Sequence, residues 1–304
     1  MIYTLTMNPC IDKFYYFDEI KRGDVNRPEK IENITGGKGI NVSKALNVMG
    51  CSNKALFFSG GKTGEKFQEM AAEEGIEFIS IGCSGETRTN LMLRGLKTQE
   101  EIRVNEKGPV VNRENIERLY EEIGKLKKED TIIISGSLPE GVEESFYYEI
   151  GSRIKSEKGS NVIIDSDLEE MKYALKCGLF MIKPNREELA RITGGSGEIG
   201  ELIELCNKYE IKYGFLSDGK KGAYLYSNKK LYRIIPPEVK ALTTVGAGDS
   251  FIGGFIAGIT SGKELKECLK YAAGLSAAKV EGKFNRERAE ELSEKAVIEE
   301  ADTF

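Results

Sequence analysis

The chain has 304 residues, and its 49 acidic and 44 basic side chains give a formal net charge of −5. This length allows one large α/β domain or two small ones, and we expect one domain with a small appendage. Neither sign of charge gathers in a long run, which argues against a nucleic-acid or membrane surface and favours a small-molecule partner. No apolar run approaches the ~20 residues that span a bilayer, and the amino terminus lacks a signal core, so we expect a cytoplasmic protein.

Histidine is absent, which excludes imidazole bases, Ser-His-Asp triads and histidine metal sites. The six cysteines are far apart and include no Cys-x-x-Cys pair, so neither a zinc site nor a disulfide framework is indicated. Any general base must therefore be a carboxylate, a lysine, a tyrosine or a cysteine.

The chain begins with a short apolar segment, Ile2–Thr6, which predicts a central strand. Asp12 follows it, and ligands of open α/β sheets gather at the carboxyl ends of the strands. An aspartate after a strand is also a common turn former, so the residues alone leave both readings open. The β-like segments Lys13–Phe17 and Glu29–Ile34 are too short and too polar for core strands.

A helix is predicted after Gly36-Gly37-Lys38-Gly39, because apolar residues then recur on one face until Gly50. From residue 54 onward strands and helices alternate, which predicts a parallel sheet with helices on both faces. The predicted strands are Ala55–Phe58, Glu77–Ile81, Thr131–Ser135, Val162–Asp165 and Leu179–Lys183, and the predicted helices are Lys66–Glu74, Arg113–Leu126, Glu144–Lys155, Glu264–Val280 and Glu287–Glu294.

Two common nucleotide motifs are incomplete. Gly61-Lys62-Thr63 mimics the end of a P-loop, but Leu56 stands where the first glycine is required. No complete G-x-G-x-x-G lies at a strand-helix junction, which argues against a nicotinamide enzyme.

The segment from Thr243 to Phe251 combines a glycine turn with the start of an apolar helix. Gly246 and Gly248 have no side chain to block a ligand, so the free N–H groups of the helix could bind an oxyanion. We expect Asp249 to stay ionised, because the same N–H groups and the helix dipole favour its charged form. A carboxylate there could accept a proton from an alcohol. The alternative is a turn followed by an aspartate cap on a buried helix, and this segment alone does not decide between the two.

Two segments resemble the signatures of the ribokinase-like (PfkB) carbohydrate kinases: Gly36-Gly37-Lys38-Gly39-Ile40-Asn41-Val42 and Thr244-Val245-Gly246-Ala247-Gly248-Asp249. The resemblance covers nearly the whole chain and is strongest with the 1-phosphofructokinase and tagatose-6-phosphate kinase branch. It implies a ribokinase-like three-layer α/β fold, with a mostly parallel central sheet, helices on both faces and a small β-sheet lid. Residues 1–304 would form a single kinase domain, with the lid at about 12–36 and 87–107.

The resemblance also implies roles for residues of the acceptor site. Asp249 would be the catalytic base, with Gly246, Ala247 and Gly248 holding the transferring phosphoryl group. The sugar would bind Asp12, Gly37, Asn41 and Asn90, and its phosphate would bind Arg27, Lys38, Arg88 and Ser137. Arginine suits a phosphate because its guanidinium donates two parallel hydrogen bonds. Read without the resemblance, Lys38 could be a solvated loop lysine and Ser137 part of a proline turn.

ATP sites are implied in two further segments. Lys183-Pro184-Asn185-Arg186-Glu187-Glu188 resembles the family's Asn-x-x-Glu, in which Asn185 and Glu188 would organise Mg²⁺ and the ATP phosphates, Glu188 through water. From residues alone, Glu187 and Glu188 are charges in the first turn of a helix. The nucleotide loop would be Ser217, Asp218, Gly219, Lys220, Lys221 and Gly222, together with Gly248.

The implied activity is ATP- and Mg²⁺-dependent phosphorylation of a ketohexose monophosphate, with fructose 1-phosphate giving fructose 1,6-bisphosphate. Tagatose 6-phosphate is an alternative substrate, because residues 105–109 resemble the tagatose subgroup. A catalytically silent sugar-phosphate sensor is an alternative of another class, and a ribose or nucleoside kinase is disfavoured by Lys38. The resemblance further implies a homodimer formed through the lid.

Overall fold

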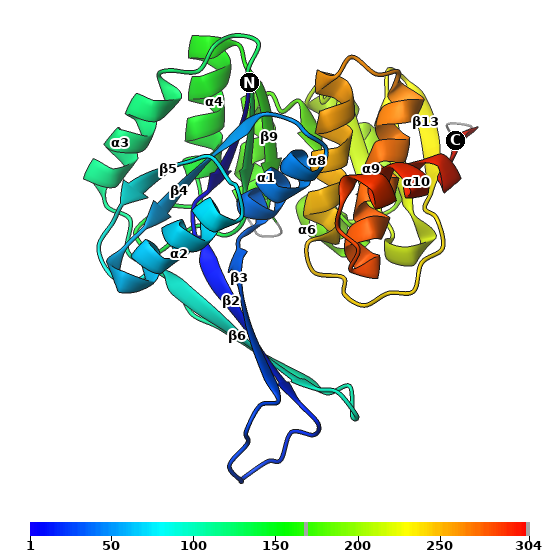
Figure 1. Ribbon diagram of the computed structural model, residues 1–304. Helices are drawn as coiled ribbons and strands as arrows, with labels where there is room; N and C mark the ends of the chain where they lie inside the picture. Colours follow the sequence, from blue (N-terminus) through cyan, green and yellow to red (C-terminus); the bar gives the residue numbers. More distant parts are fainter. Residues whose placement is uncertain (167–169, 302–304) are drawn as a thin grey trace.

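The structure, a computed structural model, describes residues 1–166 and 170–301. Two sheets organise it: a large sheet in the body and a small sheet that projects from the body (Figure 1). Within the described residues, no helix combines the length and apolar composition needed to cross a membrane. None of the six cysteines forms a disulfide, as the sequence predicts.

The large sheet has ten strands, and it is parallel from β5 to β11. Its last three strands pair antiparallel. In spatial order the strands are β14 (Val297–Ala301), β13 (Lys230–Ile235), β12 (Ala223–Ser227), β11 (Tyr213–Ser217), β10 (Met181–Ile182), β9 (Asn161–Asp165), β8 (Thr131–Ser135), β1 (Ile2–Thr6), β4 (Asn53–Ser59) and β5 (Phe78–Gly82). Since parallel strands end at one edge, this order brings the carboxyl ends of β1, β8, β9 and β10 side by side.

Helices cover both faces of the large sheet, which makes the three layers that the sequence predicts. The helices are α1 (Lys38–Val48), α2 (Gly61–Glu73), α3 (Arg113–Ile123), α4 (Phe146–Lys158), α5 (Glu170–Ala174), α6 (Arg186–Thr193), α7 (Ile199–Lys208), α8 (Ala247–Thr260), α9 (Leu265–Glu281) and α10 (Arg286–Lys295). One core contains apolar residues of α1, α8, α9 and α10, and the core on the other face contains those of α3, α4, α6 and α7. The packing of α1 against α8 brings their amino termini together.

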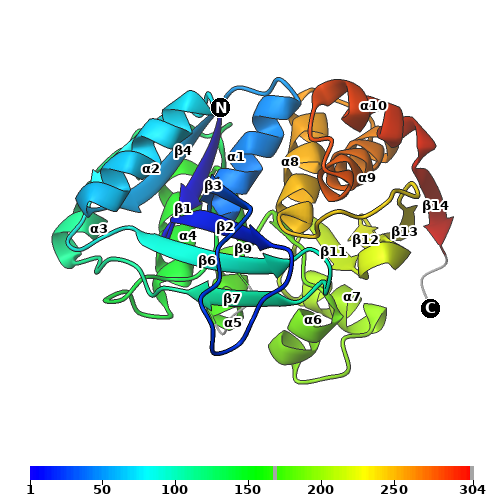
Figure 2. The same ribbon diagram turned by 60° about the horizontal axis from the view of Figure 1, so that its bottom comes forward.

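The small sheet consists of β3 (Lys30–Gly36), β2 (Cys10–Phe17), β6 (Arg88–Gly95) and β7 (Glu101–Asn105), in that spatial order. Strands β2 and β6 pair parallel, and the two outer pairs are antiparallel. Figure 2, in which the bottom of Figure 1 comes forward, shows β2, β6 and β7 running across the front of the body. The predicted small sheet is therefore confirmed, although β2 begins at Cys10, before the predicted segment Lys13–Phe17.

Some boundaries differ from the prediction for identifiable reasons. Helix α2 begins at Gly61, five residues before the predicted start, because the carboxylate of the distant Glu86 accepts hydrogen bonds from the amides of Lys62 and Thr63 and satisfies its first turn. Strand β10 is shorter than predicted, and β14 was not predicted. The acidic β14 lies at the sheet edge and is defined mainly by its pairing with β13.

Candidate active site

The glycine turn before α8 is tightly packed. Gly246 has a φ of 76°, and a Cβ there would lie 3.1 Å from Cε of Lys279 and 3.6 Å from Nδ2 of Asn41. In the described part of the chain, the backbone N–H groups of Gly248 and Asp249 have no hydrogen-bond acceptor. The amino terminus of this 14-residue helix can therefore receive an anion.

Asp249 is buried, with 7% of its surface exposed, and its Oδ2 accepts a hydrogen bond of 2.8 Å from Nδ2 of Asn41. Burial raises the pKa of Asp249 to about 6, and nearby Asp165 adds to the rise, while Asn41 and two lysines oppose it. The pKa therefore lies above that of an ordinary aspartate, because desolvation outweighs the groups that favour the charged form. With a pKa about one unit below neutral, Asp249 is still mainly ionised at pH 7 and is a stronger base than an ordinary aspartate.

Two lysines flank the buried Asp165 at the end of β9. Nζ of Lys38 lies 3.5 Å from Oδ2 of Asp165, and Nζ of Lys183 lies 3.9 Å from Oδ1. Burial opposes ionisation of Asp165, but the two lysines outweigh it and keep its pKa below the usual value. The same lysines also act on the pKa of Asp249, so all four charges belong to one site. Lys38 is therefore not a solvated loop lysine.

The predicted sugar ligands meet where the small sheet joins the body. Asp12 and Asn90 are register partners in β2 and β6, and Nδ2 of Asn90 donates to Oδ1 of Asp12 at 2.9 Å. Arg88 donates through Nη2 to the carbonyl of Asn8 at 2.9 Å. Five buried polar atoms in β6, at the ends of β1 and β8 and in the loop after β1 have no hydrogen-bond partner: Thr6 Oγ1, Asn8 Oδ1, Arg88 Nε, Asn90 Oδ1 and Ser135 Oγ. Such atoms are costly unless a polar ligand meets them.

Ser137 and Arg27 are both predicted to bind the sugar phosphate, but they lie in different parts of the structure. Ser137 lies just after β8, beside the end of β1, and is half-buried. Arg27 is exposed in the loop between β2 and β3, at the end of the small sheet that points away from the body (Figure 1). The assignment of Arg27 to the site of its own chain is therefore wrong, because the two long strands carry this loop away from Asp249.

A hollow of about 800 Å³ opens directly against Gly248. Its polar side includes five residues predicted to bind ATP: Asn185, Ser217, Gly219, Lys220 and Gly222. Lys183, which was not predicted, also lines it. Its apolar side includes Ile234, Pro236, Val239, Phe251 and Val280. A polar rim next to the anion turn with an apolar wall behind it suits a phosphate chain attached to a flat, largely apolar ring.

Three predicted nucleotide residues do not line this hollow: Glu188, Asp218 and Lys221. Asn185 and Glu188 form a capping box at the start of α6, since each side chain accepts from the other's amide at 2.9 Å. The carboxylate of Asp218 pairs with Nε of Arg186 at 3.1 Å. Both contacts hold the polar rim in place, which is a structural role for these side chains.

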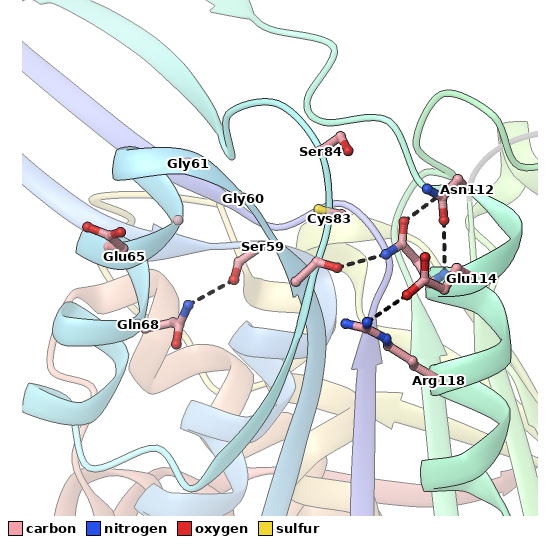
Figure 3. Close-up of a pocket in the computed structure, with 13 residues that line it drawn as sticks. Ser59, Gly60, Gly61, Glu65, Gln68, Cys83, Ser84, Asn112, Glu114 and Arg118 are labelled. Carbon is pink, nitrogen blue, oxygen red and sulfur yellow. Dashed lines mark hydrogen bonds and ion pairs between the residues drawn. The ribbon is translucent and has the colours of Figure 1, made fainter.

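A second hollow of about 450 Å³ lies at the amino termini of α2 and α3, and Figure 3 shows its lining. Its side chains pair with one another: Gln68 donates to Ser59 at 3.0 Å, and Arg118 donates to Glu114 at 2.7 Å. The amide of Thr63 in the P-loop-like segment already donates to Glu86 at 2.8 Å. This geometry agrees with the exclusion of a P-loop, because the amides that would bind phosphate are occupied.

Asn41 of the first glycine segment and Asp249 of the second are 208 residues apart and directly hydrogen-bonded. The sequence pattern of the family described as "pfkB family carbohydrate kinase" matches residues 5–289. The chain belongs to this family. It is thus a carbohydrate kinase, a phosphotransferase with an alcohol acceptor.

Proteins similar to this PfkB kinase include kinases of sugar phosphates. It is 32% identical to 1-phosphofructokinase of Bacillus subtilis over 274 residues, 89% of each chain. It is 31% identical to tagatose-6-phosphate kinase of Staphylococcus epidermidis over 280 residues, 90% of this chain and 89% of that one. The solved structure of phosphofructokinase-2 from Escherichia coli in complex with substrates and products superposes with a TM-score of 0.92 at 27% identity, covering 97% of this chain and 98% of that chain.

Three further charged residues lie at the site of this PfkB kinase but were not among the predicted ones. Asp165 is the last residue of β9 and Lys183 directly follows β10, and this position at the carboxyl ends of buried strands is the signal that could have identified them. Lys279 comes from the last turn of α9 and packs its Cε over Gly246, and burial together with the nearby Lys44 lowers its pKa. No sequence pattern connects Lys279 to the glycine turn, because only the packing of α8 against α9 brings them together.

Proposed function

We propose that this PfkB kinase transfers the γ-phosphoryl group of ATP to the free terminal hydroxyl of a ketohexose monophosphate, with fructose 1-phosphate as substrate and fructose 1,6-bisphosphate as product. The observation that carries the proposal is the cation Lys38, held at the start of α1 by Asp165 and close enough to Asp249 to lower its pKa. A fixed cation beside the base suits an acceptor that already carries a phosphate. The similarity to 1-phosphofructokinase of Bacillus subtilis supports the fructose assignment.

In this proposal Asp249 accepts the proton of the attacking hydroxyl, and Asn41 fixes the orientation of its carboxylate. The free N–H groups of Gly248 and Asp249 receive the negative charge of the transferring group. Lys183, whose Nζ lies 3.1 Å from where a Cβ of Gly248 would be, adds positive charge on the nucleotide side. Phosphoryl transfer depends mainly on such positioning and charge neutralisation, so a weakly basic carboxylate is sufficient.

The residues fit a Mg²⁺ ion held mainly by ATP. Within the described residues no group of three or more His, Cys, Asp or Glu could hold a metal, so these residues offer no full set of protein ligands. Glu188 uses Oε2 to accept from the amide of Asn185, and its other oxygen remains to bind the ion through water. When bound, Mg²⁺ would neutralise phosphate charge.

Tagatose 6-phosphate is the second candidate substrate. The segment that resembles the tagatose subgroup is attached to the sugar site, since Nδ2 of Asn8 donates to the carbonyl of Lys107 at 2.9 Å and the amide of Thr89 donates to Glu106 at 2.7 Å. The tagatose-6-phosphate kinase of Staphylococcus epidermidis supports this alternative.

One panel assay tests these assignments. ADP release is measured with fructose 1-phosphate, tagatose 6-phosphate and fructose 6-phosphate at equal concentrations, and the highest kcat/KM identifies the substrate. A higher kcat/KM with either 6-phosphate than with fructose 1-phosphate would overturn the fructose 1-phosphate assignment. Single-turnover ATP consumption tests the silent sensor, which would bind a sugar phosphate without consuming ATP.

We also propose that the small sheet acts as a lid and joins two chains. The strand registers place a set of apolar residues on one face, opposite to the face of Asp12 and Asn90: Tyr15, Ile31, Leu91, Leu93, Ile102 and Val104. Ile31 and Val104 are 50% and 48% exposed. A second copy covering this face would remove them from water, and closure over the sugar would exclude water from the phosphoryl donor.

A further inference from the structure

Thr35, the next-to-last residue of β3, is fully buried, and its polar groups form hydrogen bonds with charged side chains. Its hydroxyl donates to Oε2 of Glu74 at 2.8 Å, and its amide donates to Oε1 of the same carboxylate at 3.4 Å. Its carbonyl accepts from Nζ of Lys44 at 2.7 Å. Lys44 and Glu74 form an ion pair of 2.7 Å with each other. We call Thr35, Lys44 and Glu74 the root cluster.

The position of β3 explains why Thr35 needs these partners. Strand β3 is at the edge of the small sheet, so the groups of Thr35 that point away from β2 have no neighbouring strand. Glu74 follows the last residue of α2, and Lys44 lies in α1, so the root cluster ties the small sheet to two helices of the body. Hydrogen bonds to ionised groups are stronger than neutral ones, which makes this a firm attachment.

The chain passes from the root cluster directly into the sugar site. A side chain at Gly36 would overlap the carboxylate of Asp12, so the backbone at this position supports that carboxylate. Gly37, with a φ of 117°, is the N-cap of α1, and Lys38 is the first residue of that helix. A shift of Thr35 would therefore displace both Asp12 and the amino terminus of α1.

We propose that Glu74 and Lys44 are positioning residues for the acceptor sugar phosphate. The root cluster is the fixed point about which the small sheet closes, and it holds Asp12 and Lys38 at the spacing that the substrate requires. Neither residue touches the substrate, and both act through Thr35 and the two glycines. This inference rests on the proposed function, because it concerns the sugar-phosphate side of that site.

The variants Glu74→Gln and Lys44→Met test the role, with Glu73→Gln as matched control on the same turn of α2, where the side chain is exposed. For both test variants we expect kcat/KM for the sugar phosphate to fall roughly tenfold, mainly through KM, because a charge-assisted contact that fixes the site is lost. The KM for ATP should stay within about twofold, because the nucleotide hollow shares no residue with the root cluster. Lys44→Arg, which keeps the charge, should recover most of the loss.

The outcomes separate this inference from the proposed function. A lower melting temperature with unchanged kinetics would reduce the root cluster to a structural cap of an edge strand and overturn the inference. Equal losses in the KM for ATP and for the sugar phosphate would overturn it as well. If the unaltered kinase phosphorylates no sugar phosphate, the proposed function itself is wrong, and that result appears before any variant is made.

Discussion

The pKa of Asp249 leads to a specific pH profile. If the base must be ionised, the rate follows its ionised fraction, which for a pKa of about 6 is about nine tenths at pH 7 and about one tenth at pH 5. We therefore expect kcat/KM to fall about tenfold between these two values. An aspartate with the usual pKa of 3.8 would still be more than about nine tenths ionised at pH 5, so kcat/KM would scarcely fall between pH 7 and pH 5.

The assay must separate Asp249 from the substrate, because a sugar phosphate titrates near pH 6 as well. Unphosphorylated fructose has no such group, so measuring its slow phosphorylation from pH 5 to 8 as ADP release removes the titration of the acceptor phosphate from the profile. Lys38→Met should move the acid limb to higher pH, because Lys38 lowers the pKa of Asp249 by favouring its charged form.

Two results would refute this reasoning. The first is a rate with fructose that is flat between pH 5 and 7. The second is an Asp249→Asn variant that keeps turnover within a few-fold, because the amide keeps the shape of the side chain but cannot accept the proton.

Four further predictions follow from the geometry. At pH 8, above the pKa of Asp249, Lys38→Ala should lower kcat/KM for the sugar phosphate roughly thirtyfold but scarcely change the rate with fructose or the affinity for ATP, and equal losses with both sugars would contradict its phosphate role. Asn185→Ala and Glu188→Gln should raise the Mg²⁺ concentration needed for half-maximal rate, whereas an unchanged requirement would leave only their capping role. Gly246→Ala should lower both kcat and the melting temperature, because a φ of 76° strains any residue with a Cβ and the added methyl group would lie 3.1 Å from Cε of Lys279, and unaltered kinetics would disprove the tight turn. Ile31→Glu should halve the mass measured by light scattering if two chains pair through the small sheet, and a monomeric parent protein would refute that pairing.

Most of the architecture could be predicted from local patterns. The alternation of short apolar strands with amphipathic helices predicts the parallel sheet, and the polar segments around Asp12 predict the small sheet. The short β10 and the edge strand β14 could not be predicted well, because their extent depends on pairing with distant strands.

The candidate site was predictable only where the chemistry is local. Asn41 and Asp249 lie in recognisable glycine segments, and the structure joins them. Lys279 enters the site only through the packing of α9 against α8, which leaves no mark on the nearby sequence. The pKa of Asp249 also required the structure, because a helix terminus lowers it and burial raises it, and only the packed environment decides which effect is larger.

The pleat of β2 has a consequence for how the small sheet can vary. Successive residues of a strand point to opposite faces, so Asp12 faces the sugar site while Lys13 and Ile11 face the other way. Inserting one residue within β2 before Asp12, with the start of the strand kept in register, would turn the carboxylate to the apolar face and bring an apolar side chain to the sugar. Inserting two would restore the original orientation. The number of paired residues in β2 before Asp12 is therefore constrained by parity, and viable changes within this part of the strand should add or remove residues in pairs.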